Sequence, residues 1–266
     1  MAKKFSLNII ADRELHNVSK MLFGIFLEDI NFSCDGGLNA NMVNNSRFDG
    51  IYLSRKGYSE LKAFIFKTDP HSEIDRLRYW GLFGGTMESC HNDPVAENSW
   101  YARIQVDEKG RLENFGYNGG KRNSQACAMS ISKGKTYEFS CWGRSQNYQG
   151  NITISVTDGN GEALTDTAQL TPSRSWEEIT LTLFGRQTGY GKLVLEFMGK
   201  GTVDLDGISL MPVDTWGKSD PRWSQGKLRR DLVEVLRDLK PKFLRFPGAA
   251  SLKAMVLGTN TTGKIR

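Results

Sequence analysis

The feature that most limits the fold is a series of short segments in the middle of the chain, in which apolar and polar residues alternate. Such alternation places apolar side chains on one face of a β-strand and polar side chains on the other. Glycine-containing turns, such as residues 158–161, separate the segments, because glycine tolerates positive φ. The segments are residues 99–106, 126–132, 136–144, 151–157, 176–184, 192–198 and 202–211. Their spacing predicts a jelly-roll-like antiparallel β-sandwich over residues 86–212.

A second pattern, outside this region, predicts part of a parallel sheet. Residues 21–27 form a continuous apolar run, which is typical of a strand buried on both faces. Later in the chain, residues 228–239 have the apolar stripe of a helix that Pro241 ends, and a short strand follows at residues 243–246. The chain thus has a strand, a long intervening region, a helix and a second strand. This is the order of a βα unit into which the sandwich is inserted. We therefore expect an α/β plus all-β chain, whose α/β part supplies two strands of a parallel sheet or barrel.

These patterns divide the chain into parts of different character. With 266 residues, of which 39% are apolar, the chain is long enough for two folded units. We expect an N-terminal strand and the first barrel elements in residues 1–85 and the sandwich in residues 86–212. A linker, the barrel helix and the second barrel strand occupy residues 213–248, and residues 249–266 form an aberrant tail.

Charge and metal-ligand spacing argue against several classes of function. The formal net charge of +5 comes from 35 basic and 30 acidic residues scattered along the chain, which argues against a nucleic-acid partner. The four cysteines form no CxxC pair, and the three histidines form no group with metal-ligand spacing. We therefore expect neither a zinc site nor a disulfide framework, and no cofactor.

Hydropathy gives no sign of a membrane partner. No run approaches the roughly 20 apolar residues that span a bilayer, and the apolar stretch at residues 5–10 is too short and too polar for a secretory signal. We therefore expect a cytoplasmic protein with reduced thiols.

Two carboxylates, Glu28 and Asp29, stand at the carboxyl end of the first apolar run. In a barrel of alternating strands and helices, this end is the face where ligands bind. A carboxylate there accepts hydrogen bonds from ligand hydroxyl groups, and each contributes about 1.5–3 kcal/mol. Composition alone also allows a simpler interpretation, in which the pair caps a helix or meets an arginine, because structural ion pairs outnumber functional carboxylates.

The predicted sandwich carries candidate binding residues of two kinds. Trp142, Trp176 and Tyr148 are candidates for stacking on sugar rings, although such residues more often belong to a core. Asp204 and Asp206 alternate with apolar residues and are candidate calcium ligands, which an exposed strand face explains equally well.

Several stretches together resemble the N-terminal part of the family 51 α-L-arabinofuranosidases. In chain order, they are LFGIFLEDIN, GGLNANMVNNSRF, the alternating region, DLDGISLMPVDTW and LRRDLVEVLRDLKPKFLRFPG. The resemblance spans residues 21–248 and is strongest at both ends. It implies an incomplete (β/α)8 barrel in this chain, with a carbohydrate-binding-module-like, jelly-roll-like sandwich inserted after the first strand. It also implies an enzyme that removes terminal arabinofuranose from arabinan, arabinoxylan and related glycans.

The resemblance assigns a role to Glu28, which matches the family's arabinose-contacting glutamate after the first barrel strand. Asp29 receives no such role. Family catalysis is retaining and uses two glutamates, about 5–5.5 Å apart, as acid/base and nucleophile. Both come from later barrel strands, so the resemblance assigns no catalytic residue here. We expect this chain alone to be inactive, and homo-oligomerisation of the full-length protein stays open.

The last residues depart from the family pattern. After Pro247 and Gly248, family members usually have a second glycine, whereas this chain continues with Ala249. One permitted coding of residues 250–254, read two bases later, encodes isoleucine, valine, glutamate and glycine, and many members contain valine-glutamate-glycine at this point. A frameshift from about Ala249 is therefore one explanation of the tail, and a deliberate truncation or a natural short paralogue are others.

Two other functions stay open from the sequence. The chain is a non-catalytic carbohydrate-binding protein if the sandwich is its working part. Alternatively, the sandwich is purely structural and supports barrel assembly or contacts between subunits.

Overall fold

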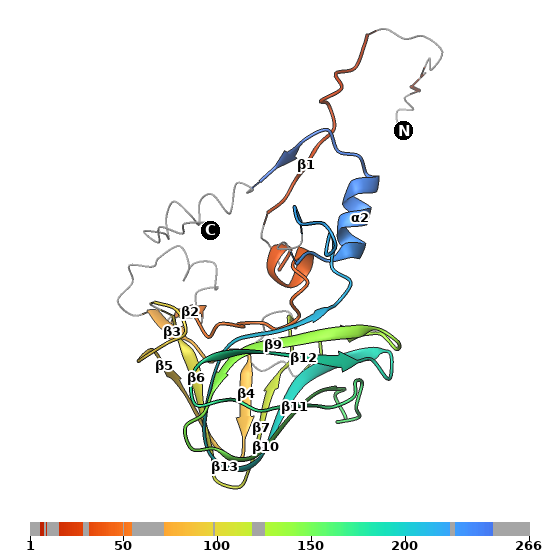
Figure 1. Cartoon of the computed structure of the whole chain (residues 1–266). Helices are drawn as coiled ribbons and strands as arrows, with labels where there is room; N and C mark the ends of the chain where they lie inside the picture. Colours follow the sequence, from red (N-terminus) through yellow and green to blue (C-terminus); the bar gives the residue numbers. More distant parts are fainter. Residues whose placement is uncertain are drawn as a thin grey trace, which may run out of the picture.

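The computed structural model describes residues 6–7, 9, 16–28, 32–49, 51–54, 72–97, 99–118, 126–223 and 227–246 (Figure 1). Most of the regular structure in these residues is β-strand. The helical elements are an irregular turn, η1 (Cys34–Leu38), and the helix α2 (Arg230–Asp238). In the part of the chain so described, no helix is long and apolar enough to cross a membrane. Asp29 and the tail at residues 249–266 lie outside the described residues.

One long strand, β13 (Gly189–Pro212), organises a ten-stranded antiparallel sheet. Its first part pairs with β10 (Gln149–Thr157) and β7 (Lys109–Asn114). Its second part pairs with β9 (Thr136–Arg144) and β6 (Tyr101–Val106). The other strands are β4 (Trp80–Phe83), β5 (Thr86–Cys90), β8 (Met129–Ile131), β11 (Ala168–Leu170) and β12 (Glu177–Phe184).

These pairings give two half-sheets that share β13. The first half-sheet has the order β11-β10-β13-β7-β4, and the second has the order β12-β9-β13-β6-β5. The strand β8 pairs with the start of β13. A separate antiparallel hairpin consists of β2 (Ile51–Ser54) and β3 (Ser72–Asp75).

The two half-sheets enclose one hydrophobic core, because alternate side chains of each strand point between them. In β10, for example, Ile152, Ile154 and Val156 are buried, as the alternation predicts. The core contains Leu112, Ile152, Ile154, Leu195 and Phe197 from the first half-sheet and Ile104, Phe139, Leu183, Leu205 and Leu210 from the second. The prediction of a large antiparallel β unit is therefore confirmed.

The strand β13 passes from one half-sheet to the other near Gly199. This glycine lies opposite Gly150 of β10, and both have positive φ angles, +156° and +150°. A Cβ atom at Gly199 would lie 2.1 Å from the carbonyl oxygen of Gln149, so only glycine fits without a shift of the backbone. The glycines interrupt the alternating pattern but not the strand, which is why the predicted segments 192–198 and 202–211 form a single strand.

A short parallel pair lies apart from the large sheet, beside α2 (Figure 1). The strand β1 (Ile25–Phe26) pairs with β14 (Leu244–Arg245), and α2 precedes β14 in the chain. The structure thus contains the parallel neighbours and the intervening helix that the βα pattern predicts.

The prediction that residues 21–27 form a strand buried on both faces is wrong for this structure. The strand is only two residues long, and the side chains of Met21, Leu22, Phe23 and Phe26 are 57–75% exposed. Its one described neighbour in the sheet is β14, and no residue of α2 is buried. Among the described residues, β1 is therefore covered only in part: Ile25 is partly buried, while Phe26 is exposed.

Candidate functional site

Glu28 lies directly after β1, at the carboxyl end of the parallel pair. The N–H of Leu27 donates to the carbonyl of Arg245 at 3.0 Å, so the pairing extends to the residue before Glu28. The backbone carbonyl of Glu28 accepts a hydrogen bond from the hydroxyl of Ser33, just before η1. The Glu28 residue is partly exposed. The carboxyl end of parallel strands is where α/β folds place their ligands.

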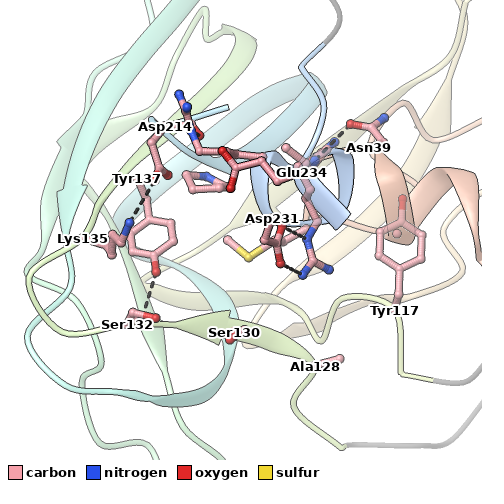
Figure 2. A pocket seen from close by; sticks show the side chains of 17 residues that line it. Asn39, Tyr117, Ala128, Ser130, Ser132, Lys135, Tyr137, Asp214, Asp231 and Glu234 are labelled. Carbon is pink, nitrogen blue, oxygen red and sulfur yellow. Dashed lines mark hydrogen bonds and ion pairs between the residues drawn. The ribbon is translucent and has the colours of Figure 1, made fainter. Parts of the chain in front are cut away.

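A pocket of about 430 Å³ lies between α2 and the large sheet (Figure 2). Several of its charged groups form ion pairs with each other. Lys135 contacts Asp214 at 2.9 Å, and Arg229 contacts Asp231 at 2.5 Å. Glu28 is not among the residues that line this pocket. Because opposite charges already meet there, we interpret the pocket as the contact region between α2 and the sheet.

A buried cluster of ion pairs lies on the second half-sheet. Asp204 of β13 stands in register between Arg103 of β6 and Arg144 of β9. Its carboxylate accepts hydrogen bonds from both arginines at 2.8–2.9 Å. The hydrogen bonds to Asp204 raise the pKa of Arg103 above its ordinary value. Since both carboxylate oxygens bind arginines, this arrangement favours a structural role for Asp204 over calcium binding.

Trp176 packs against the same cluster. Its indole N–H donates to the carbonyl of Asp93 at 2.9 Å, and its ring meets Tyr101 edge-on at a centroid distance of 5.2 Å. The guanidinium of Arg144 lies 4.5 Å from the centre of the indole ring, a cation–π contact. These contacts favour a packing role for Trp176 over a free surface for sugar stacking.

Trp142 and Asp206 lie opposite each other on β9 and β13. Asp206 is 5% exposed, and its carboxylate accepts a hydrogen bond from the N–H of Gly207 at 2.7 Å. Burial raises the pKa of Asp206 to about 6. The structure shows no group of three or more potential metal ligands among the residues that it describes. Trp142 is half-buried.

Tyr148 lies just before β10 and has a third set of neighbours. Its ring packs edge-on against Phe197 at 6.2 Å, and its hydroxyl donates to the carbonyl of Asn151 at 3.2 Å. Each of the three predicted stacking residues therefore has different surroundings, and Tyr148 lines a groove on the sandwich.

The sequence did not single out Arg103 and Arg144. Each lies on the polar face of an alternating segment, as does Asp204, and this shared phase is a signal for contact. The strand register that places them side by side is not visible in the local pattern.

Comparisons with known proteins agree with the resemblance noted above. No protein-family model matches the chain. The extracellular exo-α-L-arabinofuranosidase of Streptomyces chartreusis is 28% identical over 232 residues, which are 87% of this chain and 24% of the relative. The α-L-arabinofuranosidase 1 of Arabidopsis thaliana is 29% identical over 238 residues, which are 87% of this chain and 31% of the relative. The chain thus spans between about a quarter and a third of these curated relatives.

A solved structure extends the likeness to the fold. The arabinose-bound MgGH51 α-L-arabinofuranosidase matches 88% of this chain and 35% of its own, with a TM-score of 0.65 and 22% identity. At this identity, the match establishes similarity of fold alone. The chain is therefore similar, in sequence and in fold, to part of the α-L-arabinofuranosidases, which confirms the resemblance that its sequence indicates.

Proposed function

We propose that this chain forms the part of an α-L-arabinofuranosidase that contains the first two barrel strands and an inserted jelly-roll-like sandwich. The reaction is the retaining hydrolysis of terminal α-L-arabinofuranosyl residues from arabinan- and arabinoxylan-type glycans. The observation that carries the proposal is the parallel pair β1–β14 with Glu28 at its carboxyl end. In a (β/α)8 barrel this end is the active-site face. The names of the curated relatives support the substrate class.

Exposed apolar side chains support a larger barrel around β1, α2 and β14. The exposed fractions are 75% for Phe23, 61% for Phe26, 64% for Leu239 and 62% for Phe246. Parallel sheets in α/β proteins are covered on both faces, and a two-stranded sheet is marginally stable by itself. In the proposed enzyme, neighbouring βα units cover these side chains.

In this proposal Glu28 binds substrate and does not take part in proton transfer. Its carboxylate accepts hydrogen bonds from arabinose hydroxyl groups and so positions the sugar ring. The acid/base and nucleophile glutamates, about 5–5.5 Å apart in a retaining enzyme, belong to other barrel strands. The chain by itself is inactive, because the parallel strands β1 and β14 do not close a barrel.

A chimera tests this function. In the Arabidopsis relative, this chain replaces the matched segment, and the product is assayed with 4-nitrophenyl α-L-arabinofuranoside. We expect the chimera to hydrolyse this substrate. A chimera that folds cooperatively by circular dichroism, yet hydrolyses no arabinofuranoside, would contradict the proposal.

The chain alone provides the complementary assay. We expect no turnover of the same chromogenic substrate above a buffer blank. Turnover that disappears with Glu28→Gln would show that this chain is an enzyme without further barrel strands, and would overturn the proposed inactivity.

A further inference from the structure

A groove of about 520 Å³ lies on the sandwich, away from Glu28 and from the pocket in Figure 2. One side consists of residues 145–151, which lead from β9 into β10. The other side consists of residues 169–174, which lead from β11 towards β12. The volume lies within the range of about 300–1,000 Å³ that is typical of small-ligand sites.

Neutral amide groups form the rim of this groove. The exposed residues Gln146, Gln149, Asn151 and Gln169 all line it. Asn151 and Gln169 contact each other at 3.4 Å, whereas the amides of Gln146 and Gln149 make no hydrogen bond to any residue that the structure describes. These two amides are therefore available to a ligand, and each both donates and accepts hydrogen bonds.

Two ring side chains, the half-buried Tyr148 and Pro172, also line the groove. The backbone N–H of Tyr148 donates to the hydroxyl oxygen of Ser145 at 2.9 Å, which fixes the start of this segment. Ring side chains beside exposed amides match a sugar unit, which presents an apolar ring face and a set of hydroxyl groups.

The charged side chains of the groove indicate which net charge its ligand carries. Among the described residues that line the groove, Arg174 is the one charged side chain, and none is an aspartate or glutamate. The lining therefore offers no carboxylate to pair with a cationic ligand, and it offers a polyanion one guanidinium, that of Arg174. The groove is better suited to a neutral ligand.

We propose that this groove binds a neutral oligosaccharide segment of arabinan or arabinoxylan, separately from the sugar that Glu28 contacts. The choice of these polymers rests on the proposed function. Of the predicted stacking residues, Tyr148 lies in the groove, while Trp142 and Trp176 are not among its lining residues. The sandwich thus holds the polymer, while hydrolysis takes place in the barrel.

Affinity electrophoresis of the chain tests the proposal. Native gels with and without soluble arabinan or arabinoxylan report binding as retarded migration. We expect at least one polymer to retard the wild-type chain, and the double variant Gln146→Ala/Gln149→Ala to bind about tenfold more weakly, since two hydrogen bonds are lost. Both side chains are exposed, so the double variant is expected to fold normally. Gln105→Ala removes an exposed glutamine on β6, outside the groove, and serves as the matched control with unchanged binding.

Two results would overturn the proposal: no retardation of the wild-type chain by either polymer, or equal retardation of the wild-type chain and the double variant. The test is also separable from that of the proposed function. Polymer binding by the chain together with a folded, inactive chimera would contradict the proposed function and leave the groove assignment intact.

Discussion

Replacement of Asp204 by alanine tests whether the buried cluster of ion pairs that it forms with Arg103 and Arg144 stabilises the second half-sheet. The side chains of Asp204 and Arg144 are 7% and 8% exposed, and Asp204 also binds Arg103. In the variant, the buried guanidinium of Arg144 keeps Asp93 as a carboxylate partner, and the Asp93 side chain is 81% exposed. Loss of one partner from a buried ion pair costs about 3–5 kcal/mol, because the other charge stays buried.

This cost is large enough to measure by thermal and urea unfolding. For a domain of about 150–250 residues, each kcal/mol changes Tm by about 2–4 °C, so Asp204→Ala should lower Tm by about 6–20 °C. Asp93→Asn is the matched control, since it changes the exposed partner of the same arginine. Exposed ion pairs contribute about 0.2–1 kcal/mol, so the control should change stability only slightly.

The reasoning is refuted if Asp204→Ala costs no more free energy of unfolding than Asp93→Asn. The same assay separates the calcium alternative. Ion pairing predicts that millimolar calcium chloride leaves the Tm of the wild-type chain unchanged, whereas a calcium site at Asp204 predicts a rise that the variant loses.

Three further predictions concern Asp206, Gly199 of β13 and the exposed strand β1. Burial raises the pKa of Asp206 from 3.8 to about 6, so the folded state binds this proton more tightly than the unfolded state, and stability falls as pH rises through that window. Asp206→Asn should therefore lose less stability than the wild-type chain between about pH 4.5 and 7.5 in paired thermal melts, and equal losses would contradict the assignment. Gly199→Ala should cost about 1–3 kcal/mol in urea unfolding, and clearly more than Gly159→Ala, where the nearest atom to a Cβ atom is Cys127 Sγ at 3.9 Å; similar costs would argue against the requirement for glycine at position 199. The exposed apolar side chains beside and on β1 favour self-association of the chain, so Phe26→Ser should increase the monomer fraction in size-exclusion chromatography. It should not lower the urea midpoint, because Phe26 is 61% exposed; a lower midpoint would mean that Phe26 is packed.

Alternation locates those strands of the large sheet whose inward side chains are apolar. The segment 136–144 coincides with β9. The strand β7 escapes detection, because buried Gly110 and Asn114 flank Leu112 on the same face. The amide of Asn114 donates to the backbone carbonyl of Asn44, which is 70 residues away in sequence. The local alternation of apolar and polar residues does not indicate a hydrogen-bond partner so far away in the sequence.

The same limit applies to the site residues. The position of Glu28 follows from the apolar run that precedes it, so the sequence places it at a strand end. The surroundings of Trp176 and Asp204 depend on arginines from other strands, which only the register brings together. Gln146 lies between two strands and Gln149 is the first residue of β10, and in the sequence this polar stretch looks like any exposed turn.

The most direct test of the account is the kcat/KM of the chimera for 4-nitrophenyl α-L-arabinofuranoside, with and without Glu28→Gln. A lost charge-assisted hydrogen bond of about 1.5–3 kcal/mol corresponds to a decrease of about 10- to 150-fold. We predict this decrease for Glu28→Gln and an unchanged kcat/KM for Glu178→Gln, which alters an exposed glutamate on β12. An unchanged kcat/KM for Glu28→Gln would contradict the assignment of Glu28 as a substrate contact at the barrel mouth.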